Sequence, residues 1–170
     1  MKNIFIITLI LFSVVFVNAQ EKEKKSRKQI RAEREAKKIA DTKSMLETKA
    51  FVFTPSQAIP TGMRSVNLTS SFDAKIKNDS IYCYLPYYGT SHTASYGSNQ
   101  SPMDFNLPIL KYTSEPAKKG GWTIKFDVKN KSDLLNFTFK ISETGTTSLN
   151  VTSTSRASIS YYGDLGKLEE

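Results

Sequence analysis

The sequence predicts a mainly β protein: an antiparallel sheet of about eight or nine strands, closed as a barrel or doubled as a sandwich, preceded by a long basic helix. Short apolar runs follow one another from Phe51 onward, with turn residues about every ten positions. No helical pattern separates these runs, which argues against a parallel α/β sheet. Upstream lies a charged segment without Gly or Pro, which is typical of a helix.

The charged segment, residues 20–48, forms a predicted helical extension. Residues 21–50 hold eleven basic and six acidic residues, whereas residues 51–170 hold twelve and ten, so the basicity is local. If the helix docks on the sheet, Ile39, Met45 and Leu46 form its apolar contact. Its role is either that of a solvated spacer or that of a contact for an anionic envelope polymer or protein partner. Nucleic acid is not an expected partner, because acidic residues are interspersed and aromatics are missing from the segment.

The first nineteen residues read as a signal peptide. Lys2 precedes an apolar run over residues 4–17, and Val17-Asn18-Ala19 gives a cleavage pattern with Gln20 as the new first residue. The alternative is an uncleaved anchor, but the run is shorter than the roughly 20 apolar residues that a spanning helix needs. We therefore expect an exported chain, periplasmic or extracellular, whose mature form has no transmembrane segment.

The β-domain is expected over residues 49–165, with residues 166–170 as a tail. Phe51-Val52-Phe53 opens a strand that Pro55 should end. Asn78-Asp79 predicts the turn of a hairpin, because both residue types tolerate a left-handed backbone. The clearest half-buried strand alternates apolar and polar residues from Trp122 to Lys129. Further strands are expected at residues 65–69, 105 onward, 110–112, 135–141, 149–151 and 157–161.

A tyrosine-rich stretch suggests a binding surface. Residues 86–102 form a long loop rich in Tyr, Ser, Gly and Thr, and tyrosine gives large contact area together with a directed hydrogen bond. The alternative is that these tyrosines only cover the core. The predicted ligand contacts are Tyr82, Tyr84, Tyr87, Tyr88, Tyr96, Arg156 and Tyr162.

A second aromatic stretch near the C-terminus prompts a packing hypothesis. Tyr161 or Tyr162 would pack beside Tyr87 or Tyr88, and Arg156 would stack on that cluster or bond to it. An arginine with ordinary surface contacts is the alternative.

Signals for catalysis and metal binding are weak. Cys83 is the only cysteine, so no internal disulfide forms, and its alternation with Ile81 and Leu85 predicts a buried, unreactive thiol. The single histidine, His92, can be combined with Asp104 into a hydrolase hypothesis. A Cys83–His92–Asp104 arrangement can also be written, but Cys83 is expected to be buried with no activating neighbour, which is the wrong environment for a thiolate. No ligand spacing for a metal and no phosphate-binding loop is present, so we expect no cofactor.

Three motifs together carry a family resemblance: Tyr84-Leu85-Pro86-Tyr87-Tyr88-Gly89, Phe105 to Pro108, and Arg156-x-x-Ile159-x-Tyr161-Tyr162-Gly163. With them the chain resembles the bacterial domain-of-unknown-function family 4251, over about Leu46 to Leu165. Ser95 stands where the family pattern has Pro, and Tyr88 stands where Phe is common. The resemblance implies an envelope or secreted protein of a Gram-negative bacterium. It implies no activity and no functional residue.

These observations favour a non-catalytic exported module that binds a small apolar or sugar-like ligand, or an envelope partner, through the tyrosine-rich loop. A structural or interaction scaffold of the envelope is the first alternative. A hydrolase that uses His92 and Asp104 is the second.

Overall fold

The computed structural model describes residues 26–90, 101–118 and 120–168. The predicted signal peptide and its cleavage site at Ala19 and Gln20 lie outside these residues. The one helix in the described part, α2, runs over Arg27–Glu47. At its start, the Gln29 side chain accepts a hydrogen bond from the Ser26 backbone N–H at 2.8 Å, which is one of the two bonds of a capping box. It ends before Lys49, whose backbone is left-handed at φ 50°.

Ten strands follow the helix. Their bounds are β1 Phe51–Pro60, β2 Val66–Asn67, β3 Asp73–Lys77, β4 Ser80–Tyr84, β5 Asp104–Pro108, β6 Leu110–Pro116, β7 Trp122–Asn130, β8 Asp133–Ile141, β9 Thr146–Ser153 and β10 Ile159–Gly166. Asn78 and Asp79 both have positive φ and join β3 to β4, which confirms the predicted hairpin. The alternating strand from Trp122 is confirmed as β7.

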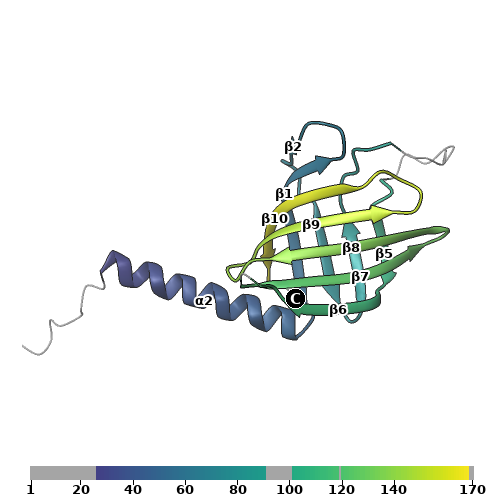
Figure 1. Ribbon diagram of the computed structural model, residues 1–170. Helices are drawn as coiled ribbons and strands as arrows, with labels where there is room; N and C mark the ends of the chain where they lie inside the picture. The colour runs from purple at the N-terminus through teal and green to yellow at the C-terminus, as the bar shows by residue number, and fades with distance from the viewer. Residues whose placement is uncertain (1–25, 91–100, 119, 169–170) are drawn as a thin grey trace, which may run out of the picture. The chain divides into compact units, whose positions relative to one another are not determined.

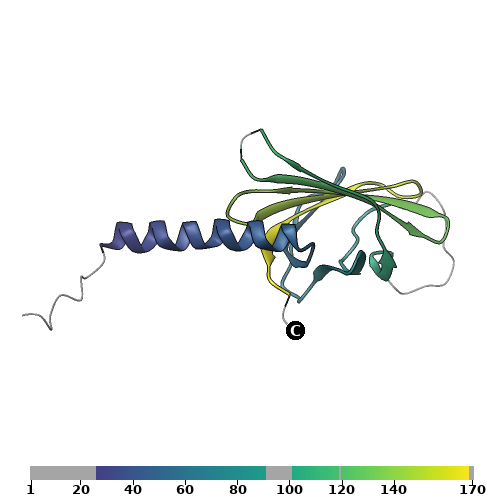
Figure 2. The same cartoon turned by 90° about the horizontal axis from the view of Figure 1, so that it is seen from below.

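The strands form one antiparallel sheet that curls into a nearly closed barrel, so the barrel alternative of the sequence prediction is correct. The order is β5-β4-β3-β1-β10-β9-β8-β7-β6, and β2 adds two residues alongside β1. Figure 1 shows β6 to β9 as one wall with β3 to β5 behind it, and Figure 2 shows the curvature of the sheet. The edge strands β5 and β6 are joined in sequence by Ile109 alone, and no ladder among the described strands pairs them.

The prediction that Pro55 ends the first strand is wrong. β1 continues to Pro60 because the register against β10 shifts between Pro55 and Gln57, and this bulge absorbs the proline. Pro55 lies opposite Gly163, where a Cβ would overlap the carbonyl oxygen of Thr54. The close approach of the two strands at the bulge therefore requires glycine on β10.

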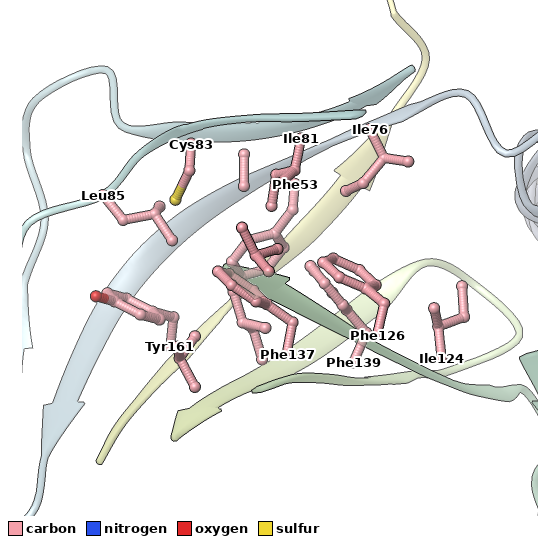
Figure 3. Packing of buried hydrophobic residues seen from close by; sticks show 14 of the residues in the cluster. Phe53, Ile76, Ile81, Cys83, Leu85, Ile124, Phe126, Phe137, Phe139 and Tyr161 are labelled. Atoms are coloured by element: carbon pink, nitrogen blue, oxygen red, sulfur yellow. The ribbon is translucent and has the colours of Figure 1, made fainter. Parts of the chain in front are cut away.

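Aromatic side chains fill the barrel interior (Figure 3). Phe139 on β8 makes edge contacts with Phe51 and Phe53 on β1, at centroid distances of 6.0 and 5.7 Å. Phe137 stacks on Phe126 at 5.1 Å and meets Phe105 of β5 at 6.5 Å. Each such pair adds about 0.5–1.5 kcal/mol beyond its area burial, so the two walls are held by a continuous aromatic core.

The C-terminal half of α2 packs on this barrel. Met45 and Leu46 are buried, as predicted, and Ile39 is half-buried. Thr42 is also buried, a contact that the apolar pattern did not indicate. Lys167, just after β10, pairs with Asp41 at 2.7 Å on the helix surface.

Candidate functional site

The outward face of β4 carries an exposed aromatic group. Ile81 and Cys83 point into the core, so the alternation of the strand turns Tyr82 and Tyr84 outward, with 48% and 50% of their surfaces exposed. The Phe72 ring lies 5.4 Å from the Tyr84 ring. We call Phe72, Tyr82 and Tyr84 the β4 aromatic face.

Polar residues flank the β4 aromatic face on both neighbouring strands. Tyr82 lies opposite Lys75 on β3 and Asn106 on β5, while Asp104 of β5 lies opposite Tyr84. These partners alternate outward with the tyrosines, so a molecule resting on the rings has hydrogen-bonding groups on either side.

Tyr162 does not join this group. It is 48% exposed on β10, which β1 and β3 separate from β4. Its register partners are Gln57 and Ser148. The exposed predicted residues therefore lie on two separate parts of the outer surface, and Tyr96 lies outside the described residues.

The start of the tyrosine-rich loop is fastened to the connection between β9 and β10. The buried Tyr161 hydroxyl donates to the carbonyl oxygen of Pro86 at 2.8 Å. The Tyr87 hydroxyl donates to the carbonyl oxygen of Ala157 at 2.8 Å, and the Ala157 N–H donates to that of Thr90 at 3.1 Å. Burial raises the pKa of Tyr87, while the Arg156 charge opposes that rise. Tyr87 and Tyr88 are both half-buried and pack against the hydrophobic core.

Arg156 belongs to a polar cluster that the sequence analysis did not find. Its guanidinium lies 2.8 Å from the carboxylate of Asp133, and their side chains are only 18% and 8% exposed. Ser153 donates to both Asp133 oxygens, at 2.8 and 2.9 Å, and Thr154 donates to one at 2.9 Å. We call Asp133, Ser153, Thr154, Ser155 and Arg156 the Asp133 cluster.

The donors of the Asp133 cluster set the charge of its carboxyl. Burial alone would raise the Asp133 pKa, but hydrogen bonds from Ser153, Ser155 and Thr154, with the Arg156 charge, hold that pKa below its usual range. The carboxylate thus stays ionised and satisfied. In the sequence, only the hydroxyl-rich run Ser153-Thr154-Ser155 before Arg156 pointed to such a cluster. Nothing in this run identified Asp133 as the residue that accepts its hydrogen bonds.

A groove lies between the end of α2 and strands β6 and β7. It has a volume of about 270 Å³. We call it the helix–strand groove. It is lined by Lys43, Leu46, Glu47, Lys49, Tyr112, Ser114 and Trp122. The Lys49 ammonium lies 4.9 Å from the Tyr112 ring centroid and 3.5 Å from the Asp79 carboxylate. The sequence analysis did not connect these residues, because they come from three separate elements.

Tyr112, on one wall of the groove, has an unusual environment for its hydroxyl group. Its hydroxyl is buried and has no hydrogen-bond partner among the described residues. Burial, with a smaller effect of the Asp79 charge, raises the pKa of Tyr112 to about 12. The strand bulges between Leu110 and Thr113, and Lys111 has a left-handed backbone at φ 51°. Bulges commonly redirect a side chain next to a site, and here the affected residue is Tyr112.

The described residues do not form the active site that the hydrolase hypothesis needs. Cys83 is buried, as predicted, and burial, with smaller effects of the Asp104 and Asp73 charges, raises its thiol pKa, which disfavours the thiolate. Asp104 is exposed on the edge strand β5, and His92 lies outside the described residues. Within the described ranges, no group of three His, Cys, Asp or Glu side chains could hold a metal ion. No helix in those ranges is long and apolar enough to cross a membrane.

Fold and surface together define a class: a small helix-preceded, nearly closed antiparallel barrel with a filled aromatic interior. The family described as Domain of unknown function (DUF4251) matches residues 33–165. The chain belongs to this family.

A crystal structure of a DUF4251 family protein from Bacteroides eggerthii DSM 20697, at 1.95 Å resolution, is similar in fold. The TM-score is 0.57 at 10% identity, over 78% of this chain and 89% of that chain. At this identity the likeness concerns the fold alone. No curated protein matches the chain.

Proposed function

We propose that the protein is an exported, non-catalytic binding module that holds a sugar-like ligand on the β4 aromatic face. The observation that carries the proposal is the pair Tyr82 and Tyr84, half-exposed at successive outward positions of one strand, with Phe72 beside them. Exposed aromatic groups of this kind on a soluble protein commonly mark interaction sites.

The chemistry of the face favours a sugar over a purely apolar ligand. A tyrosine ring offers an apolar surface and a hydroxyl, and a sugar ring offers apolar C–H faces edged by hydroxyls. Asn106, Asp104 and Lys75 flank the rings and supply both donors and acceptors. A few polar groups beside aromatic surface is the usual composition of a small-molecule site.

The filled interior supports binding on the outside. Phe51, Phe53, Phe126, Phe137 and Phe139 are almost completely buried and in mutual contact, so they occupy the space in which a barrel of this kind could hold a ligand. The apolar run at residues 4–17 supports export. Burial of Cys83 supports a non-catalytic role, since it removes the chain's one thiol nucleophile from solvent.

Co-sedimentation with purified peptidoglycan sacculi, and gel retardation in purified envelope polysaccharide, test the proposal. Binding should weaken at least about tenfold in the Tyr82→Ala, Tyr84→Ala double variant, because truncating two central aromatic contacts costs about 1 kcal/mol or more for each ring. Tyr162→Ala is the matched control, since this tyrosine is equally exposed on a different part of the sheet.

Equal binding by the wild type and the double variant would contradict the proposal. If neither polymer binds at all, the scaffold alternative becomes the better description. Crosslinking of the intact protein in cells, mapped to residues of the β4 aromatic face or elsewhere, would then locate the contact.

A further inference from the structure

The helix–strand groove brings aromatic, basic and acidic side chains together. Trp122, the only tryptophan of the chain, is half-buried in it, and Tyr112 forms a second aromatic wall. Lys43, Lys49, Glu47 and Ser114 also line it, so basic, acidic and hydroxyl side chains border the aromatic walls. A concave site with aromatic walls and a few polar groups is the usual form of a small-molecule site.

Two of the five non-glycine residues with positive φ in the described ranges are Lys49, which lines the groove, and Lys111, the chain neighbour of Tyr112. Lys49 and Lys111 have left-handed backbone, at φ 50° and 51°. Lys111 precedes Tyr112 in the chain, and the Lys49 ammonium lies 4.9 Å from the Tyr112 ring centroid. Such conformations cost free energy in non-glycine residues and gather at ligand sites. The buried Tyr112 hydroxyl without a partner among the described residues is a second departure from ordinary packing.

The two lysines of the groove are held loosely. Lys43 is 3.9 Å from the Glu47 carboxylate, and Lys49 is 3.5 Å from Asp79, with all four side chains about half exposed or more. Exposed pairs of this kind contribute little, so a ligand carboxylate can compete for either ammonium. Glu47 would repel a second anionic group and accept hydrogen bonds from ligand hydroxyls.

We propose that the helix–strand groove binds a hydroxylated ring that carries one carboxylate, the chemistry of a sugar acid. The ring lies against Trp122 and Tyr112, its carboxylate meets Lys49 and Lys43, and a ring hydroxyl donates to Glu47. This second site is independent of the β4 aromatic face. The groove volume of about 270 Å³ suits a single ring rather than a chain.

A second hollow near α2 gives a contrast. It measures about 330 Å³ and is lined by Ser44, Met45, Thr48, Ala50, Lys77, Lys167 and Leu168. It also holds two lysines, but it has no aromatic wall. Volume and positive charge alone therefore do not single out the groove; its aromatic walls do.

Trp122 gives a site-specific measurement. Because it is the only tryptophan, its fluorescence reports on the groove, and glucuronate should change the emission of the purified protein saturably. Glucose has the same ring without the carboxylate and should change it at least about tenfold less effectively. Lys49→Met should weaken the glucuronate response by a similar factor, while Tyr82→Ala should leave it unchanged.

Lys111→Met is the matched control variant. Lys111 also has left-handed backbone and also pairs with an aspartate, Asp127 at 3.6 Å, but it does not line the groove. Equal loss in both variants, or equal binding of glucose and glucuronate, would overturn the proposal. No response to glucuronate at millimolar concentration, in fluorescence and in ligand-observed NMR alike, would overturn it as well. Loss of polysaccharide binding in the Tyr82 and Tyr84 variant concerns the other site only.

Discussion

The Asp133 cluster and the helix–strand groove each contain a largely buried polar group next to a positively charged side chain, but the two groups differ in whether they are hydrogen-bonded. In the Asp133 cluster, Ser153, Thr154 and Arg156 all donate to the carboxylate. In the groove, the Tyr112 hydroxyl has no partner among the described residues. A satisfied polar cluster stabilises the fold, whereas a buried hydroxyl without a partner carries an uncompensated desolvation cost.

Removing the Asp133 carboxylate should give the largest effect. Asp133→Ala leaves the largely covered Arg156 without its partner, and breaking such a pair costs about 3 kcal/mol. Urea unfolding measures the loss. Asp164→Ala is the control, because this exposed aspartate accepts one hydrogen bond from Thr146, and its loss should cost about 0.5 kcal/mol or less. A loss below about 1 kcal/mol in Asp133→Ala would show that the cluster is not a stability element.

Acid should remove part of the same contribution. The folded-state pKa of Asp133 is lowered, so its stabilisation is complete above the unfolded-state pKa of about 3.9. It is lost as the pH falls through the lower folded-state pKa. Urea midpoints measured from neutral pH into this acid range should fall more steeply for the wild type than for Asp133→Asn. Parallel profiles would contradict the assigned shift.

Two tyrosine-to-phenylalanine substitutions compare a buried hydroxyl that has a partner, at the start of the tyrosine-rich loop, with the one in the groove that has none among the described residues. Tyr161→Phe removes the donor to the buried Pro86 carbonyl oxygen, which should cost about 1–1.5 kcal/mol. Thermal and urea unfolding both measure this loss. The substitution keeps the ring that packs in the core, so a larger loss would indicate that the start of the loop detaches.

Tyr112→Phe should have the smallest effect. Its hydroxyl makes no hydrogen bond to a described residue, so its removal should change the free energy of unfolding by about 0.5 kcal/mol or less, or increase it. The stacking of the ring on Phe126, at 6.1 Å, is kept. A loss as large as that of Tyr161→Phe would mean that the hydroxyl is satisfied, and would remove the contrast between the two regions.

The strand pattern was readable from sequence because it depends on near neighbours. The alternation from Trp122 to Val128 predicted β7, Asn78-Asp79 predicted a turn, and Cys83 followed the buried face of β4. The length of β1 was not readable, because its passage through Pro55 depends on a bulge against β10, a strand about 100 residues later. A partner strand, and not the local propensity, decides such a case.

The amino-acid sequence by itself determined the mainly β class, the charged helix and the family membership, since periodicity, composition and short motifs are local properties of the chain. Only the tertiary structure decided which side chains meet. It brought the Tyr161 hydroxyl to the Pro86 carbonyl oxygen, paired Arg156 with Asp133, and placed Lys49 beside Tyr112 in one groove with Trp122. Those contacts depend on strand order and register across large sequence separations, which no single segment encodes.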